Sequence, residues 1–450
     1  MGGMLVVALL SSAVSGAPPA ALEVSQLCGA YRWDSGGFVD IQVWEELGPG
    51  QLVAFDDRGW VRALTPAGAR AFTAGRSIAV PEPVAARVRF EPADGAVPAR
   101  TLVWYVDGQP PRVARRVEDA RVEDMTFANS ATHLAGTLMT PLTAGPHAAL
   151  VLAHGSGPQD RNGTLPFARF LVRHGIAILT FDKRGVGASQ GDWRKASFEI
   201  LAADALAAVA FLRSRPNVDA KRIGLFGVSQ GGWVGPLAAS RSRDVALVVS
   251  VSGPGVTPGE QMLDMIEAEL RLSEVPEQEV QEALGLTQLA FRYGRTGAGW
   301  EEYAAALARS RERSWLPYLR LPANVQDGQW EQQRFFYHYD PAPALASLRC
   351  PVLALFGGKD SGVPAEKNRS RWQEALTRAR HREHDLIVIP AANHVMFEAS
   401  SGSMFEIPSL DRFVPEYRMI LLDWLRGRFG IREQPPTPVS PGSERPTDNS

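Results

Sequence analysis

The sequence predicts an α/β protein: a mostly parallel sheet flanked by helices, with a helical insertion and a small N-terminal antiparallel β-domain. Short β-prone runs separated by turn signals fill residues 20–120, which is an antiparallel pattern. Across residues 121–431, continuous apolar runs alternate with helical patterns, as in a parallel sheet covered on both faces. Between about residues 256 and 340 that alternation is interrupted by helical patterns without a clear strand.

The N-terminal region contains four runs rich in β-branched and aromatic residues, which we expect to form strands. They are residues 38–44, 51–55, 87–90 and 101–105. Turn signals containing glycine, proline and aspartate separate them. The region shows no set of residues suited to acid–base chemistry, so we expect this β-domain to serve packing or substrate access.

The larger domain begins with an expected hairpin, followed by the alternating elements. The hairpin comprises residues 122–127 and 134–138, and the strands are 148–153, 176–181, 222–226, 245–251, 352–356 and 386–389. The helices expected between and after them are 166–174, 198–214, 233–240, 260–272, 276–293, 300–313, 365–378 and 414–429. Many aromatic residues lie within the insertion; they are expected to pack it onto the main domain or to shape a substrate pocket beneath a lid.

Composition narrows the function classes. A chain of 450 residues with 45% hydrophobic residues can bury a sizeable core. A formal net charge of -2 with 21% charged residues gives no electrostatic reason to expect nucleic acid or an anionic membrane as a partner. The two cysteines, Cys28 and Cys350, fit no metal-site spacing, and the sequence leaves their pairing open.

The two ends of the chain differ from its body. Residues 1–17 form an apolar run followed by small residues, which predicts a signal peptide and a periplasmic or secreted protein. The run is too short to span a bilayer, so no stable membrane anchor is expected; the other interpretation is a poorly ordered N-terminus on a cytoplasmic protein. Residues 432–450 are rich in proline, serine and charge, which predicts a disordered tail.

The most informative motif surrounds Ser229, where residues 227–231 read G-x-S-x-G. An apolar run precedes the motif and a helical pattern follows it. A sharp turn between a strand and a helix holds a serine with its hydroxyl exposed, and glycines beside it avoid collision with neighbouring backbone. The alternative is a small-residue turn without catalytic role.

Ligands of an open α/β sheet bind beyond the carboxyl ends of its strands. The histidine and the acid that act with this serine should therefore follow strands of the same sheet. His394 follows the expected strand 386–389, whereas His381 and His384 stand at its entrance. Asp360 follows strand 352–356. A histidine can take the proton of a serine nucleophile near neutral pH, and a carboxylate fixes the histidine tautomer. Ser229, Asp360 and His394 are therefore predicted to form a catalytic triad.

The same chemistry needs two donors for the developing oxyanion. We expect one to be the backbone N–H of Gln230, directly after the serine. The other should come from the loop after strand 148–153, where the N–H of Ser156 is the first choice, with Gly155 or Gly157 as alternatives. A dinucleotide-binding loop is the competing interpretation, but Asp160 stands where its third glycine is required.

Residues 121–430 resemble the α/β-hydrolase superfamily, whose chain order of serine, acid and histidine they share. The motifs HGSGPQDR at 154–161 and FDKRGVGAS at 181–189 resemble those of bacterial carboxylesterases with an N-terminal β-domain. The resemblance implies an α/β-hydrolase fold, with Ser229 as nucleophile, Asp360 as acid and His394 as base. It also implies hydrolysis of short acyl esters without metal or organic cofactor.

Asp182, Lys183 and Arg184 in the second motif directly follow an expected strand. We expect a salt-bridged turn that holds the loop; the alternative is that these side chains line the site.

Three functions remain open. The first is a serine carboxylesterase that cleaves small-molecule esters of short to medium acyl chains. An acyl-peptidase or a thioesterase uses the same nucleophile, base and oxyanion hole. A binding protein built on a hydrolase fold is the third, and the presence of all three triad residues argues against it.

Overall fold

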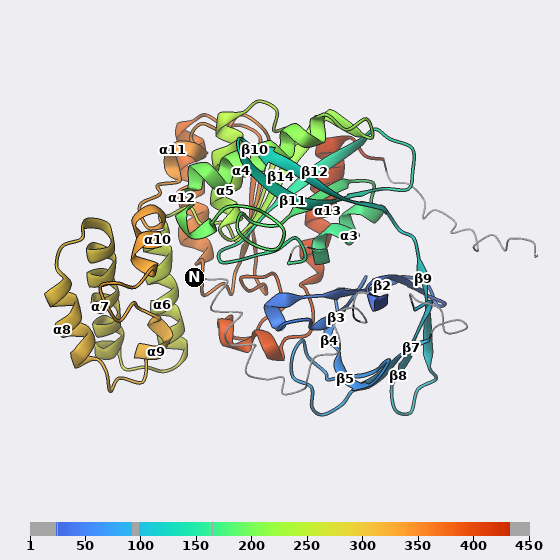
Figure 1. Ribbon diagram of the computed structural model, residues 1–450, viewed down its shortest axis with the longest axis horizontal. Helices are drawn as coiled ribbons and strands as arrows, with labels where there is room; N and C mark the ends of the chain where they lie inside the picture. The colour runs from blue at the N-terminus through green and yellow to red at the C-terminus, as the bar shows by residue number, and fades with distance from the viewer. Residues whose placement is uncertain (1–23, 25, 92–98, 164, 433–450) are drawn as a thin grey trace, which may run out of the picture.

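The computed structural model describes residues 24, 26–91, 99–163 and 165–432. Figure 1 shows three parts: an antiparallel sheet near the N-terminus, a second sheet flanked by helices, and a helical lobe on the left of the view. The expected signal peptide at 1–17 lies outside the described residues, and so does the expected tail at 432–450 apart from its first residue. No helix among the described residues is long and apolar enough to cross a membrane.

The N-terminal sheet has nine antiparallel strands in the order β4-β3-β2-β1-β9-β8-β7-β6-β5. They are β1 (Gly29–Trp33), β2 (Phe38–Val43), β3 (Leu52–Asp56), β4 (Val61–Ala63), β5 (Thr65–Gly68), β6 (Ala71–Ala74), β7 (Ala86–Glu91), β8 (Thr101–Tyr105) and β9 (Arg112–Val117). Strands β2, β3, β7 and β8 match the four expected runs, and the other five strands were not predicted. Tyr31, Ile41, Phe90 and Leu102 are among the side chains that form its separate core.

The second sheet has eight strands in the order β10-β11-β13-β12-β14-β15-β16-β17. They are β10 (Arg121–Asn129), β11 (Thr132–Thr140), β12 (His147–Ala153), β13 (Ala177–Phe181), β14 (Val218–Val228), β15 (Val248–Val251), β16 (Val352–Gly357) and β17 (His384–Ile389). The expected hairpin is β10–β11, and it extends the sheet through antiparallel pairing of β11 with β13. Every pair from β13 to β17 is parallel.

Helices cover both faces of this sheet (Figure 1). They are α3 (Leu165–Arg173) and α13 (Pro415–Phe429) on one face, and α4 (Phe198–Arg213), α5 (Gly231–Arg241) and α12 (Ala365–Arg378) on the other. Successive side chains of a strand point to opposite faces. In β12, Leu150 and Leu152 accordingly pack with α3 and α13, whereas Ala149 and Val151 pack with α4 and α5.

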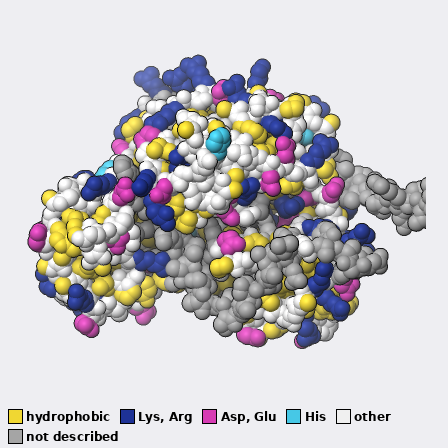
Figure 2. Space-filling model, viewed as in Figure 1, with side chains coloured by type: hydrophobic (Ala, Val, Ile, Leu, Met, Phe, Trp, Pro, Cys, Tyr) yellow, Lys and Arg dark blue, Asp and Glu magenta, His cyan; other side chains and the backbone are white. Residues whose placement is uncertain are grey.

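The helical insertion lies between β15 and β16 and contains no strand in its described residues, as expected. Its helices are α6 (Pro258–Leu272), α7 (Glu277–Thr296), α8 (Trp300–Arg309), α9 (Leu316–Leu319) and α10 (Gln329–Phe336), followed by α11 (Ala342–Leu345). The helix predicted at 300–313 is shorter in the structure, where α8 ends at Arg309. Apolar side chains gather on the visible face of this lobe (Figure 2).

The aromatic residues of the insertion divide into two groups. Tyr293, Trp300 and Tyr303 surround Trp330, whose ring lies 4.7 to 6.3 Å from theirs, so this group packs within the insertion. Tyr339, just beyond α10, stacks on Phe198 of α4 with 4.3 Å between ring centroids. The expectation that these residues pack the insertion onto the main domain is therefore met by the second group.

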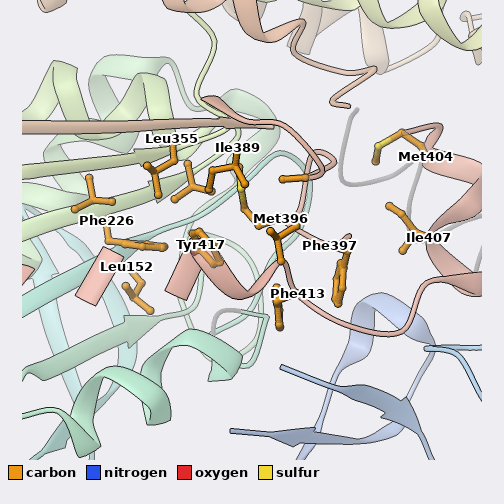
Figure 3. Packing of buried hydrophobic residues seen from close by; sticks show 14 of the residues in the cluster. Leu152, Phe226, Leu355, Ile389, Met396, Phe397, Met404, Ile407, Phe413 and Tyr417 are labelled. Atoms are coloured by element: carbon orange, nitrogen blue, oxygen red, sulfur yellow. The ribbon is translucent and has the colours of Figure 1, made fainter. Parts of the chain in front are cut away.

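The segment of residues 396–413, which follows β17, joins the two sheets. This connection was not predicted. Phe397 and Phe413 stack with 4.4 Å between ring centroids, beside Met396 and Tyr417 (Figure 3). The same segment pairs with the N-terminal sheet, because Val61 N–H donates to the carbonyl of Asp411 at 2.9 Å and Ile78 N–H donates to that of Leu410 at 2.6 Å. The contact spans over 300 residues of sequence and depends on pairing that no local pattern signals.

A buried ion cluster also connects α3 to the N-terminal sheet. Arg173 donates two hydrogen bonds of 2.8 Å to Asp40 of β2, and a third of 2.9 Å to Asp119. The side chains of Arg173, Asp40 and Asp119 are only 11%, 6% and 4% exposed. Cys28 and Cys350 are both free thiols, so the structure holds no disulfide between them.

We expect Arg173→Met to lower the free energy of unfolding by about 3–5 kcal/mol, since it leaves the buried Asp40 carboxylate without its partner. Urea unfolding followed by tryptophan fluorescence measures the change. Arg87→Met is the matched control: Arg87 pairs with Asp107 on the surface, where both side chains are more than half exposed, and its loss costs at most about 1 kcal/mol. Equal effects of the two substitutions would contradict this account of the interface.

Candidate active site

The three expected triad residues lie beyond the carboxyl ends of parallel strands of one sheet. Ser229 directly follows β14, Asp360 lies in the loop after β16, and His394 lies in the loop after β17. The register pairs β14 with β15, β15 with β16 and β16 with β17, all parallel, so these ends share one edge of the sheet. The loop after β12 begins at the same edge, because β12 and β14 are parallel neighbours.

Ser229 occupies a strained turn between β14 and α5. Its φ is +54°, in the left-handed region that non-glycine residues rarely adopt. Its N–H donates to the carbonyl of Val251 at 2.9 Å, and its own carbonyl accepts from Gly232 at 2.8 Å. Strain of this kind costs on the order of 1–3 kcal/mol and is found preferentially at functional sites.

The glycines around Ser229 are required by close backbone contacts. A Cβ on Gly227 would lie 2.1 Å from the carbonyl oxygen of Gly231. A Cβ on Gly232 would lie 2.3 Å from the Cα of Gly253. Neither position has room for a side chain, so the packing of the turn requires glycine at the first position of the motif and directly after it.

His394 and Asp360 are in contact and buried. His394 Nδ1 lies 2.9 Å from Asp360 Oδ2 and 3.1 Å from Oδ1. The backbone N–H groups of Gly362 and Val363 each donate to Asp360 Oδ1 at 2.8 Å, which fixes the carboxylate. Burial disfavours the imidazolium, but the adjacent Asp360 carboxylate outweighs it, and the pKa of His394 lies above its usual 6.5.

The loop that carries His394 is held by Asn393. The Asn393 side-chain oxygen accepts from the N–H of Val395 at 3.1 Å and from that of Phe397 at 3.0 Å. Met396, at the start of the segment that joins the two sheets, has a φ of +64°, in the left-handed region. The position of His394 therefore depends on that segment.

A catalytic triad needs a contact between acid and histidine and another between histidine and serine. The structure forms the first of these, between Asp360 and His394. Within the described residues Ser229 Oγ makes no hydrogen bond to His394. In enzymes without bound substrate the hydrogen bond between nucleophile and base is often long, and it shortens when substrate binds.

The loop after β12 supplies backbone donors beside this site. The N–H of Gly155 donates to Gln159 Oε1 at 2.6 Å and is therefore already used. In the described part of the chain, no backbone hydrogen bond engages the N–H of Ser156 or of Gln230. This favours Ser156 over Gly155 as the second oxyanion donor, with Gly157 as the remaining alternative.

Lys183 is the residue whose position the sequence did not reveal. The expected salt-bridged turn is formed by its neighbours, since Asp182 pairs with Arg161 at 2.8 Å and Arg184 pairs with Asp204 at 2.5 Å. Lys183 is instead turned inward and is only 2% exposed. The sequence feature that could have indicated this position is that Lys183 closely follows the carboxyl end of a buried strand, β13.

The helical insertion borders the acid loop. Gln261 of α6 donates to the carbonyl of Gly362 at 2.6 Å. Glu269, also in α6, accepts from Ser361 Oγ at 2.5 Å and from the N–H of Met404 at 2.8 Å. Among the described residues, no group of three or more His, Cys, Asp or Glu side chains is arranged to hold a metal ion.

Comparison with known proteins identifies the family. The model of the alpha/beta hydrolase family matches residues 150–404. Esterase EstD of Thermotoga maritima is 26% identical over 283 residues, which cover 60% of this chain and 60% of EstD, so less than two thirds of that protein is matched. The quorum-quenching protein AidA of Acinetobacter baumannii is 26% identical over 308 residues, covering 65% of this chain and 95% of AidA.

Solved structures show a distant likeness. The esterase Pf2001 of Pyrococcus furiosus aligns over 69% of this chain and 92% of its own, with 18% sequence identity and a TM-score of 0.44.

We expect Gly232→Ala to lower the melting temperature, because the new methyl group would collide with the backbone at Gly253 and overpacking costs about 1–3 kcal/mol. Differential scanning calorimetry measures the change. In the control, Gly285→Ala in α7, the added Cβ meets nothing within 4 Å, and replacing a helical glycine by alanine stabilises by up to about 1 kcal/mol. A Gly232→Ala variant as stable as the wild type would contradict the described packing of the turn.

Proposed function

Because the chain belongs to the alpha/beta hydrolase family, we propose that this enzyme is a serine carboxylesterase that cleaves small-molecule esters of short to medium acyl chains. The observation that carries the proposal is the buried contact of His394 with Asp360, at the same sheet edge as the strained turn of Ser229. A histidine oriented by a carboxylate is the group that can take the proton of a serine hydroxyl as that hydroxyl attacks a carbonyl carbon.

In the first half of the proposed reaction, Ser229 Oγ attacks the ester carbonyl carbon while His394 Nε2 takes its proton. Asp360 accepts the Nδ1 hydrogen and stabilises the imidazolium that results. The carbonyl oxygen becomes an oxyanion, which the backbone N–H groups of Gln230 and Ser156 bind. His394 then gives its proton to the departing alcohol, and the acyl group remains on Ser229.

The second half repeats the chemistry with water. His394 takes a proton from a water molecule as its oxygen attacks the acyl carbon, and the same two N–H groups bind the second oxyanion. Proton return to Ser229 Oγ releases the carboxylic acid and restores the enzyme. In both halves of the proposed reaction, His394 accepts and returns the proton.

We propose that the helical insertion acts as a lid that limits the length of the acyl chain. Two hydrogen-bonded contacts of α6, through Gln261 and Glu269, connect the insertion to the loop of Asp360. Tyr339 packs against Phe198, which also contacts Trp233 directly behind the Ser229 turn. Lids of this kind exclude water from the reaction and shape the pocket.

The same residues would serve an acyl-peptidase or a thioesterase, because attack on an amide or thioester carbonyl needs the same nucleophile, base and oxyanion donors. The name of EstD, an esterase that matches over 60% of this chain, favours the ester substrate. A binding protein on this fold would have no need of the strain at Ser229.

We expect Ser229→Ala to abolish turnover and to leave the melting temperature unchanged, because the change removes only the hydroxyl. The measurement is a substrate panel: p-nitrophenyl esters from acetate to palmitate, acyl-CoA thioesters and aminoacyl p-nitroanilides. Ser347→Ala, an exposed serine far along the chain, is the control and should retain full activity. Faster cleavage of thioesters or anilides than of esters would overturn the substrate class, and full activity of Ser229→Ala would overturn the nucleophile.

We expect kcat/KM for p-nitrophenyl butyrate to rise with pH as His394 loses its proton, with a midpoint above 6.5. The catalytic form is the neutral imidazole, and a raised pKa moves its appearance to higher pH. Asp360→Asn removes the carboxylate but not the burial, so the midpoint should fall below 6.5 and the plateau should drop by about 10⁴-fold.

The control for this pH profile is Asp340→Asn, an exposed aspartate before β16, which should leave the midpoint in place. A midpoint that Asp360→Asn does not move would contradict the assignment of Asp360.

A further inference from the structure

We propose that Lys183 is a positioning residue that fixes both donors of the oxyanion hole by binding the β12 loop and the Gln230 side chain at once. The proposal rests on the proposed serine-hydrolase function of the site. Lys183 is not a member of the triad, and the mechanism above assigns it no proton transfer.

The ammonium group of Lys183 has three acceptors within hydrogen-bonding distance. Nζ lies 2.8 Å from the carbonyl oxygen of Gly155, 3.0 Å from that of Gly157 and 2.6 Å from Gln230 Oε1. An ammonium group has three N–H donors, so all of them are used. None remains for substrate, and Lys183 therefore acts through the backbone that it holds.

The contact with Gly155 sets the direction of the Ser156 N–H. The peptide bond between these residues is trans, since the two cis peptide bonds of the described chain are at Pro83 and Pro146. In a trans peptide the carbonyl and the N–H point in opposite directions. Because the Gly155 carbonyl points at Nζ, the Ser156 N–H points away from Lys183 and stays free to bind an oxyanion.

The contact with Gln230 holds the other donor. Gln230 follows Ser229 directly, and its backbone N–H is the second donor of the proposed oxyanion hole. Its side chain accepts the shortest of the three Lys183 bonds. One buried ammonium thus joins the turn after β14 to the loop after β12, and the spacing of the two N–H groups depends on it.

No carboxylate among the described residues forms an ion pair with the ammonium group of Lys183. The neighbouring carboxylates of Asp182 and Asp204 are paired with Arg161 and Arg184. Burial lowers the pKa of Lys183 from its usual value, and the three acceptors oppose that shift because they bind the ammonium form. A buried cation without a counter-ion is costly, and such groups concentrate at functional sites.

The test compares Lys183→Met with the wild type, using Lys221→Met, an exposed lysine of β14, as the control. We expect Lys183→Met to lower kcat/KM for p-nitrophenyl butyrate by about 10²-fold, the usual effect of losing one oxyanion donor. The affinity for a trifluoromethyl ketone, which forms an oxyanion on Ser229, should fall by the same factor. Inhibition by the corresponding methyl ketone, a neutral ligand of the same shape that forms no stable adduct on Ser229, should change by no more than about twofold, because its carbonyl oxygen carries no full negative charge.

A second variant, Gln230→Leu, covers the case in which Lys183→Met does not fold. It removes one acceptor of Lys183 but keeps the backbone N–H, and we expect the same pattern with a smaller loss of about tenfold. Equal weakening of the trifluoromethyl ketone and of the methyl ketone, or unchanged affinity for the trifluoromethyl ketone in a folded Lys183→Met, would overturn the positioning role alone. A wild type that neither turns over esters nor binds the trifluoromethyl ketone would overturn the proposed function together with it.

Discussion

The parallel register of β12, β14, β15, β16 and β17 is the constraint on which the site depends. Parallel neighbours bring their carboxyl ends to one edge, so residues separated by more than a hundred positions in sequence meet there without any local signal. Strands β12, β15 and β16 are buried along their whole length, and a slip in register would disrupt the packing of their apolar side chains against the helices. The energy that fixes the sheet therefore also fixes the relative positions of the Ser229 turn, the Asp360 loop and the His394 loop.

Much of this arrangement could be predicted because the rule of strand ends operates on short apolar runs that the sequence displays. His394 was separated from His381 and His384 only by which end of a strand each occupies, and Asp360 was chosen because it follows a strand. One of the five strands missed in the N-terminal sheet has a physical explanation: β5 reads Thr-Pro-Ala-Gly and is largely exposed, so it lacks the alternation that marks a strand. The inward turn of Lys183 was missed because its three acceptors come from loops that only the folded sheet brings together.

Both added parts of the molecule bind the segment that follows His394. The N-terminal sheet holds it through backbone hydrogen bonds to Leu410 and Asp411, and the insertion holds it through Glu269 and Met404. The stacked rings of Phe397 and Phe413 belong to the same segment (Figure 3). The β-domain, in which the sequence shows no set of residues suited to acid–base chemistry, thus contacts the segment that continues the loop of the proposed base, His394.

The central claim is that Ser229, His394 and two backbone N–H groups surround one reacting carbonyl. A crystal structure of the protein treated with a trifluoromethyl ketone tests it most directly. We expect a covalent bond from Ser229 Oγ to the ketone carbon, with the oxyanion about 2.7–3.1 Å from the nitrogens of Gln230 and Ser156. An adduct on another residue, or an oxyanion directed away from the loop after β12, would contradict it.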